Sequence, residues 1–232
     1  MPSRNGWPTV DRPNPREIDL GSWERREQFE FFQSFGIPHL GLTAQIDISP
    51  LRDQLKRVGV PFTVGWVHTV ARAANAVPAL RQRIHDGRVV EFDVVHPAIT
   101  VLTERNLFTF CTLPFEEDLE VFAPEAERRI AAAKTSATLY TEPDRDDFLF
   151  MTALPWVAFT GFMHPMTLDP TDTVPRFAWG RFVEEGGRTM IPLNIQAHHA
   201  FVDGVHVGAF YQEVERGIER GIKRKAEDSA GT

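Results

Sequence analysis

The residues best suited to chemistry lie in one short stretch near the end of the chain, His198-His199-Ala200-Phe201-Val202-Asp203-Gly204. An extended apolar run from Met190 to Ala197 leads into this stretch, and a helical pattern from about Val205 follows it. The stretch is therefore predicted at a strand-to-helix junction, where the flanking elements hold exposed groups in place. A neutral imidazole, with a reference pKa of about 6.5, can take a proton from a hydroxyl or thiol at neutral pH and return it.

Spacing alone leaves three interpretations of this stretch open. The first is base catalysis by His199, with Asp203 either touching the histidine or pairing with a distant cation. The second is a hydrogen-bonded polar patch formed by His198, His199 and His206. The third is a metal site, which is the weakest of the three because the chain has one cysteine and no second His/Cys cluster with ligand spacing.

The composition argues against several classes of protein. The formal net charge is −7 and the pI is near 5.6, with no long Lys/Arg stripe, which argues against a nucleic-acid partner. No run of about 18 apolar residues exists to span a bilayer, and the first residues lack the apolar core of a signal peptide. One cysteine, Cys111, excludes an internal disulfide. We therefore expect a cytoplasmic protein with no membrane partner.

Periodicity predicts one domain in which helices and strands are mixed. Ser22 is expected to cap the first helix. Helices are expected at 23–35, 51–58, 62–77, 116–134 and 205–223, and strands at 41–48, 98–103, 107–113, 148–162, 174–183 and 188–196, with a hairpin at Asp86-Gly87 and a surface loop at 135–147. We predict an α/β two-layer sandwich, a mixed β-sheet with helices on one side. Its expected boundaries are an arm at 1–19, one domain at 20–224 and a tail at 225–232.

Two further blocks of sequence accompany the histidine stretch in a recognisable order. One is Trp23-Glu24-Arg25-Arg26-Glu27-Gln28-Phe29-Glu30, and the other is Thr152-Ala153-Leu154-Pro155-Trp156-Val157. Ile46-Asp47-Ile48, Asp86-Gly87 and His96-Pro97 fall in matching order between them. Together with His-His-x-x-x-Asp-Gly, these blocks resemble the trimeric (type A) chloramphenicol acetyltransferases. The resemblance covers about residues 20 to 222 and implies the CoA-dependent acyltransferase fold.

The resemblance also implies a role for several residues. His199 would be the general base that deprotonates an acceptor hydroxyl as it attacks the thioester carbonyl of acetyl-CoA. Asp203 would pair with Arg25 of the first helix instead of acting on the substrate. Thr152 replaces the family's serine and would donate a hydrogen bond to the oxyanion. The residues assigned to CoA binding are Trp156 and Arg181.

The acceptor pocket implied by the resemblance differs from the family pattern. The residues assigned to it are Phe31, Phe32, Phe162, Arg176 and Ala178. Phe32 stands where the family has a tyrosine, Ala178 where it has a threonine, and Arg176 in a normally apolar position. The expected acceptor is chloramphenicol or a similar small hydroxyl compound, with acetyl-CoA as co-substrate and no tightly bound cofactor or metal. The expected assembly is a homotrimer with active sites at the subunit interfaces.

Three other activities stay open on the sequence. An acyltransferase of the same fold could use a different alcohol or thiol acceptor. A dihydrolipoamide acyltransferase catalytic domain would share the chemistry, but His198 replaces the usual aspartate before the catalytic histidine, and no lipoyl segment precedes the core. A catalytically weak homologue could bind a hydrophobic ligand without turning it over.

Overall fold

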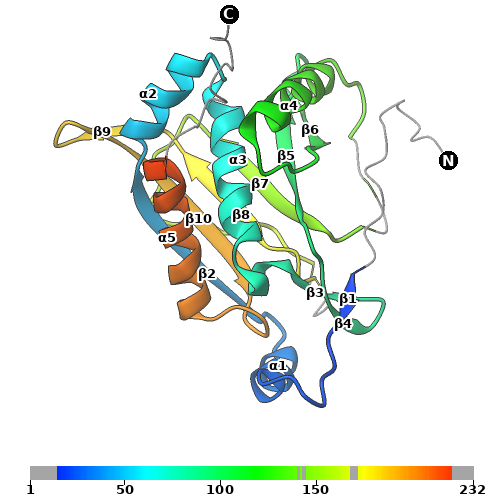
Figure 1. Cartoon of the computed structure of the whole chain (residues 1–232). Helices are drawn as coiled ribbons and strands as arrows, with labels where there is room; N and C mark the ends of the chain where they lie inside the picture. Colours follow the sequence, from blue (N-terminus) through cyan, green and yellow to red (C-terminus); the bar gives the residue numbers. More distant parts are fainter. Residues whose placement is uncertain (1–14, 140–141, 143–144, 168–171, 221–232) are drawn as a thin grey trace, which may run out of the picture.

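A seven-stranded mixed sheet forms the centre of the fold in the computed structural model, which describes residues 15–139, 142, 145–167 and 172–220 (Figure 1). The strand order is β2-β10-β8-β7-β5-β6, and β9 pairs with the start of β10. Strands β5, β7 and β8 are parallel, and the other neighbouring pairs are antiparallel. The bounds are β2 His39–Asp47, β5 His96–Leu102, β6 Phe108–Thr112, β7 Phe148–Leu154, β8 Arg176–Gly180, β9 Val183–Glu185 and β10 Arg188–His198.

A smaller sheet with the order β1-β4-β3 joins the start of the chain to a hairpin. Its strands are β1 Arg16–Glu17, β3 Gln82–His85 and β4 Arg88–Glu91. Asp86 and Gly87 have φ angles of 49° and 75°, which a tight turn between antiparallel strands requires. This confirms the predicted hairpin. Strand β1 lies in the described part of the predicted arm. Residues 1–14 and 221–232 lie outside the described residues, and with them the whole predicted tail and its boundary with the domain.

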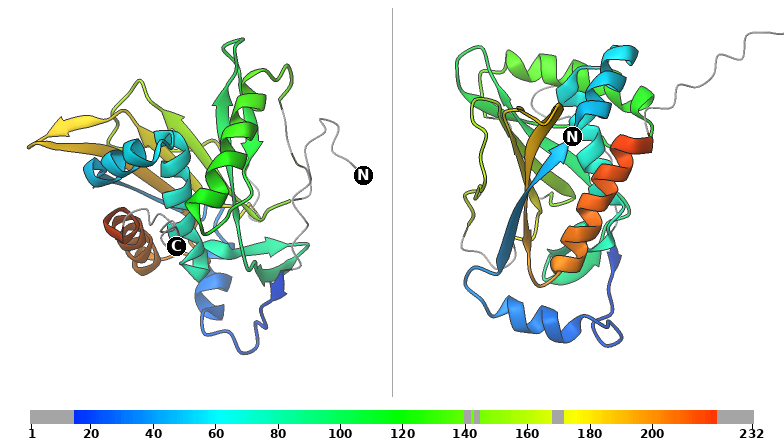
Figure 2. Two further views of the ribbon diagram at one scale, coloured as in Figure 1. Left: turned by 45° about the horizontal axis from the view of Figure 1, so that its top comes forward. Right: turned by 90° about the vertical axis from the view of Figure 1, so that its left-hand side faces the viewer.

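Helices cover one face of the large sheet, and the predicted two-layer arrangement is confirmed (Figure 2). Helices α3 and α5 lie against this face, and α2 and α4 flank them on the same side, whereas α1 lies at the end of the sheet below the β10–α5 turn (Figure 1). The bounds are α1 Arg26–Gln33, α2 Ser49–Val58, α3 Phe62–Asn75, α4 Leu119–Lys134 and α5 Gly204–Arg220, with a 3₁₀ turn at Pro78–Arg81.

Successive side chains of strand β10 point alternately to the two faces of the sheet. Leu193, Ile195 and Ala197 are fully buried in the core beneath the helices. Asn194 and Gln196 point to the opposite face, which we call the outer face. Each large apolar side chain buried in this way stabilises the fold by about 1.5–3 kcal/mol, so the histidine stretch is attached to a firmly packed strand.

The first helix begins later than predicted. Its first residue is Arg26, and Arg25 occupies the N-cap position. The prediction that Ser22 caps the helix is wrong, because the Ser22 hydroxyl instead donates to the Asp19 carboxylate at 2.9 Å. Arg25 therefore lies just before the helix, with its side chain free to reach the β10–α5 turn.

Two predicted strands are shorter than expected. Strand β7 ends at Leu154 instead of 162, because Pro155 lacks an amide hydrogen and the Val157 amide donates to the Leu154 carbonyl in a turn. The predicted strand 174–183 divides into β8 and β9 after Gly180. A Cβ on Gly180 would lie 2.5 Å from the Val157 carbonyl oxygen, so the backbones approach too closely for a side chain there. Residues 155–167 cross the outer face without regular structure (Figure 2).

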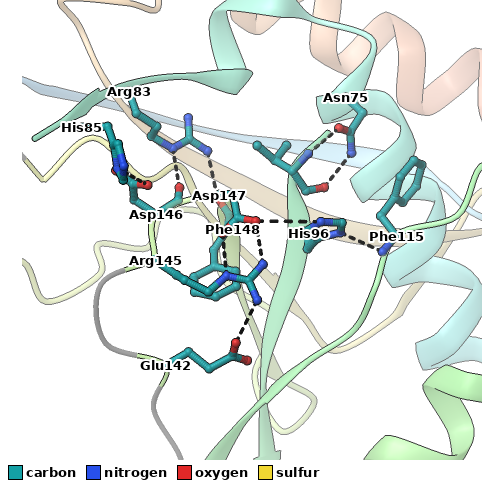
Figure 3. A network of polar contacts seen from close by, with 11 residues as sticks. Asn75, Arg83, His85, His96, Phe115, Glu142, Arg145, Asp146, Asp147 and Phe148 are labelled. Carbon is teal, nitrogen blue, oxygen red and sulfur yellow. Dashed lines mark hydrogen bonds and ion pairs between the residues drawn. The ribbon is translucent and has the colours of Figure 1, made fainter. Parts of the chain in front are cut away.

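The end of the predicted surface loop 135–147 is buried in a polar network (Figure 3). The Arg145 and Asp147 side chains are 7% and 2% exposed and form an ion pair at 2.6 Å. Arg83, fully buried, donates to the carbonyls of Leu80, Gln82, Asp146 and Phe148. These contacts hold the first residues of β7 against the small sheet, and thereby help to fix the strand that carries Thr152.

Candidate active site

The turn between β10 and α5 exposes two polar side chains while burying the residues between them. The amides of Phe201 and Val202 both donate to the His198 carbonyl at 3.1 Å, which closes the turn. Ala200, Phe201 and Val202 are buried, and the Phe201 ring packs against Phe29 of α1 with 5.5 Å between centroids. Because these residues point inward, His199 and Asp203 are left at the surface of the turn, each about one-third exposed.

Arg25 binds this turn through four hydrogen bonds, and the predicted contact with Asp203 is present. Its Nε donates to the Ala200 carbonyl at 2.7 Å, and Nη2 donates to the His199 carbonyl at 2.9 Å. Nη2 also donates to Asp203 Oδ1 at 2.6 Å, and Nη1 donates to Asp203 Oδ2. The planar guanidinium thus donates hydrogen bonds to a carboxylate and to two backbone carbonyls at once, which an ammonium group could not do. Hydrogen bonding from Arg25 holds the pKa of Asp203 below its ordinary value.

The His199 ring is held from two sides. It stacks on Phe32 of α1, with 3.8 Å between centroids and 9° between planes. Its Nδ1 lies 3.2 Å from Asp203 Oδ1, without the alignment of a hydrogen bond. Nδ1 is itself buried, so the exposed part of the side chain is the remainder, which includes Nε2. The His199 amide donates to the Pro38 carbonyl at 2.6 Å, which fixes the backbone of the residue to the start of β2.

The other two histidines of the stretch, His198 and His206, accept hydrogen bonds from backbone amides of the turn. His206 Nδ1 accepts a hydrogen bond from the Asp203 amide at 2.9 Å, and burial lowers the pKa of this imidazole. His198 is buried, and its Nδ1 accepts from the Ala200 amide at 3.2 Å. Both of these rings therefore hold the turn, whereas the His199 ring stacks on Phe32 and its side chain is one-third exposed.

Thr152 lies on the outer face of the sheet, away from His199. Its hydroxyl is 2.7 Å from that of Thr100 on β5. Thr152 pairs with Ala178, and Ala178 pairs with Asn194 of β10. Thr152 therefore lies two strands away from β10, at the level of Asn194, which precedes His199 by five positions. With about 3.3 Å per residue and about 4.8 Å per strand, the two Cα atoms are roughly 19 Å apart. In the described part of a single chain, no hydrogen bond, ion pair or ring contact joins Thr152 to His199.

The remaining predicted site residues fall into three settings. Trp156 and Arg181 are exposed, and the Arg181 amide donates to Val157, so the two lie close together beyond the end of β7. Phe31 is 60% exposed on α1. Arg176 is buried and its guanidinium is already engaged by Asp172 and by the Val174 carbonyl, so it faces the protein instead of an open pocket. Ala178 is buried beside Thr152.

Phe162, one of the residues assigned to the acceptor pocket, lines a groove of about 500 Å³ together with Gly36 and Pro38, which stand at two further pocket positions of the resemblance. The groove lies between β2, β10 and residues 160–167. Its polar lining residues are His39, Thr43, Thr160, His164, Thr167, Asn194 and Gln196. The two residues from β10 could have been found from the alternation of the strand, since they are polar positions between buried ones. His39 and His164 gave no comparable signal, because neither has a partner nearby in sequence.

Two further findings concern ions and membranes. Within the described ranges, no three His, Cys, Asp or Glu side chains gather in a way that could hold a metal ion. Among those same residues, none of the helices has both the length and the apolar character needed to cross a bilayer.

Comparison with known proteins gives a consistent result. The family model described as chloramphenicol acetyltransferase matches residues 14–215. A chloramphenicol acetyltransferase from Klebsiella sp is 31% identical over 201 residues, covering 86% of this chain and 91% of the relative. One from Streptomyces acrimycini is 30% identical over 210 residues, covering 88% and 94%. A solved chloramphenicol acetyltransferase superposes with a TM-score of 0.82 at 28% identity, covering 88% of this chain and 100% of that one.

The same fold recurs in more distant structures. A solved structure of the Azotobacter vinelandii dihydrolipoamide acetyltransferase gives a TM-score of 0.60 at 18% identity, covering 91% of this chain and 96% of the other. At that identity the similarity concerns the fold alone.

Proposed function

The chain belongs to the chloramphenicol acetyltransferase family and is an acyltransferase, and we propose that it moves the acetyl group of acetyl-CoA to a hydroxyl of chloramphenicol or a similar small molecule. The observation that carries this proposal is the turn in which Arg25 and Asp203 hold His199 with its Nε2 edge outward. The reaction would take place in the cytoplasm, with acetyl-CoA as a co-substrate that leaves as free CoA.

The proposed reaction has two steps. His199 takes the proton of the acceptor hydroxyl while the oxygen attacks the thioester carbonyl, which forms the C–O bond and a tetrahedral oxyanion. The Thr152 hydroxyl donates a hydrogen bond to that oxyanion, an interaction worth about 3 kcal/mol when it is well placed. The oxyanion then collapses, the C–S bond breaks, and the CoA thiolate receives the proton from the imidazolium. Asp203 and Arg25 position His199 and do not touch the substrate.

The two reacting groups need two chains. A separation of roughly 19 Å between the Cα atoms of Thr152 and His199 is beyond the reach of their side chains, given the strand geometry. Exposed apolar side chains are numerous near both groups, including Phe31, Ile37, Trp156 and Met163. Such exposure favours a protein-protein contact. We therefore propose a homotrimer in which His199 of one subunit faces Thr152 of its neighbour.

Thiol release from acetyl-CoA tests the chemistry. The purified protein is assayed with chloramphenicol and with a panel of other alcohols, beside His199→Ala and the matched control His85→Ala, whose imidazole lies in the small sheet. We expect a loss of about 10²- to 10⁴-fold for His199→Ala and near-normal rates for the control. Equal rates in the two variants would remove His199 as the base, and no release with any alcohol would overturn the proposed activity.

Mixing two inactive variants tests the shared site. Subunits carrying Thr152→Ala and subunits carrying His199→Ala are co-expressed, so that some interfaces in mixed oligomers combine an intact His199 with an intact Thr152. Recovery of activity above that of either variant alone is expected. Mixed oligomers as inactive as the separate variants would contradict a site built from two subunits.

A further inference from the structure

A second hydroxyl lies beside that of Thr152. Thr100 of β5 and Thr152 of β7 directly follow the paired residues Ile99 and Met151, so the two threonines are neighbours on adjacent parallel strands. Ile99 and Met151 are buried in the core beneath the helices, and by alternation both threonines point to the outer face. Their Oγ1 atoms are 2.7 Å apart, which is the usual length of an O–H···O hydrogen bond.

On its other side, Thr152 meets a side chain that cannot form a hydrogen bond. Its neighbour on β8 is Ala178, which is buried and carries only a methyl group. The next residue along this row, Asn194 of β10, donates its amide hydrogens to β2, away from Thr152. Among the residues that the structure describes, Thr100 is therefore the one hydrogen-bond partner of the Thr152 hydroxyl.

The two hydroxyl protons can be arranged in two ways, because a hydroxyl has one proton to donate and two lone pairs that accept. If Thr152 donates to Thr100, it has no proton left for a substrate. If Thr100 donates to Thr152, the Thr152 proton is free to point at the developing oxyanion. The negative charge favours this second arrangement, because hydrogen bonds that follow one another toward a charge polarise and strengthen each other.

The same hydrogen bond holds the Thr152 side chain in one rotamer. The β-carbon of threonine carries a hydroxyl and a methyl group of similar size, and rotation about χ1 exchanges their positions. A rotamer that places the methyl group where the hydroxyl should lie would leave the oxyanion without a donor. The contact with Thr100 favours the rotamer in which Oγ1 lies 2.7 Å from its partner.

We infer that Thr100 is a positioning residue for the acetyl transfer, which donates its hydroxyl proton to Thr152 and so directs the Thr152 proton at the oxyanion. The inference rests on the proposed function, in which Thr152 is the oxyanion donor. Neither threonine loses its proton, since the proton that moves is the one that His199 takes from the acceptor. Because Thr100 does not touch either substrate, it acts on the rate of the chemical step and leaves substrate binding unchanged.

Replacing Thr100 by valine tests this role, because valine keeps the shape of the side chain and removes the hydroxyl. We expect the single-turnover rate of acetyl transfer to fall about tenfold, the factor that one well-made hydrogen bond is worth, while KM for both substrates stays the same. Thr100→Ser keeps the donor and should retain most of the rate. The control Thr109→Val makes the same exchange on β6, where the hydroxyl donates to the Thr138 carbonyl, and should leave the rate unchanged.

A double-mutant cycle separates this role from a general effect on the sheet. In the Thr152→Ala background, Thr100→Val should change the rate less than twofold, because no hydroxyl is left to direct. A tenfold loss in both backgrounds would overturn the inference, since Thr100 would then act without Thr152. A wild-type rate for Thr100→Val would overturn it as well.

Failure of the inference and failure of the proposed function give different results. In both of the contrary outcomes the wild-type protein still transfers the acetyl group, so the proposed function stands and Thr100 alone loses its role. Absence of thiol release by the wild-type protein with every alcohol would overturn the proposed function, and the role of Thr100 with it.

Discussion

Replacing Asp203 by asparagine removes the charge that Arg25 pairs with and changes little else in shape. The asparagine oxygen can keep one hydrogen bond to the guanidinium, but its NH₂ group then faces the second nitrogen of Arg25, donor against donor. Arg25 retains its bonds to the carbonyls of His199 and Ala200. The substitution therefore costs one ion pair and one hydrogen bond while it leaves a cation that is only 15% exposed.

The magnitude follows from that burial. Breaking a fully buried pair costs about 3–5 kcal/mol, and breaking an exposed one about 0–1 kcal/mol. With side chains 15% and 34% exposed, the Arg25–Asp203 pair lies between these limits, and we expect a loss of about 2 kcal/mol. For a chain of this length, 1 kcal/mol lowers the melting temperature by about 2–4 °C, so Asp203→Asn should melt about 4–8 °C lower.

The assay is thermal unfolding at one protein concentration, with Glu30→Gln as the control. This control makes the same carboxylate-to-amide exchange in the Arg26–Glu30 pair of α1, whose side chains are 54% and 55% exposed. It should lose at most about 0.5 kcal/mol. Equal shifts for Asp203→Asn and Glu30→Gln would show that Arg25 does not depend on the carboxylate, and that the turn is held by its carbonyl contacts alone.

Three further predictions concern the same framework. Because the folded-state pKa of Asp203 is lowered, the melting difference between wild type and Asp203→Asn should be complete above about pH 4 and disappear as pH falls through the lowered pKa; a difference that grows toward acid would contradict this sign. Thr152→Ala should reduce kcat about 10²- to 10³-fold while Thr152→Ser retains most of it, and stopped-flow single-turnover rates would expose equal losses. Arg83→Met should lower the unfolding free energy in urea by about 3 kcal/mol or more, because four carbonyls lose a buried donor; a midpoint within error of wild type would refute that.

Much of the fold could be predicted from local pattern. The apolar alternation of 188–196 predicts β10, and Asp86-Gly87 predicts the hairpin, because in both cases neighbouring residues decide the conformation. The errors lie where distant contacts decide instead. Gly180 ends β8 because the Val157 backbone crosses it, and Arg145 and Asp147 are buried because Arg83 and the small sheet meet them. The local sequence of 135–147 and of 174–183 does not indicate that these distant residues will be in contact with them.

In the candidate site, too, local spacing predicts some contacts, and the others depend on residues distant in the sequence. Spacing alone identifies His199 and Asp203 as possible partners, since four positions and a turn bring them together. Arg25 is 178 positions from Asp203, and only the resemblance to a family of acetyltransferases connects the two. The groove required the tertiary structure, because His39, His164 and Asn194 come from three separate segments and none has a distinctive neighbour in the sequence.

The residues that the Arg25 guanidinium contacts lie outside the groove. The Arg25 guanidinium holds the turn that carries His199 by donating hydrogen bonds to two backbone carbonyls and one carboxylate, and none of these groups lines the groove. The groove is lined by side chains of β2, of β10 and of the irregular segment 160–167. Substitutions in 160–167 should cost little stability, because this segment forms no ladder of backbone hydrogen bonds. A change of His164 or Met166 to another residue should therefore alter the lining of the groove without moving His199. Selectivity in this chain should accordingly respond to groove variants through KM, while variants of the Arg25–Asp203 pair should act on kcat and stability together.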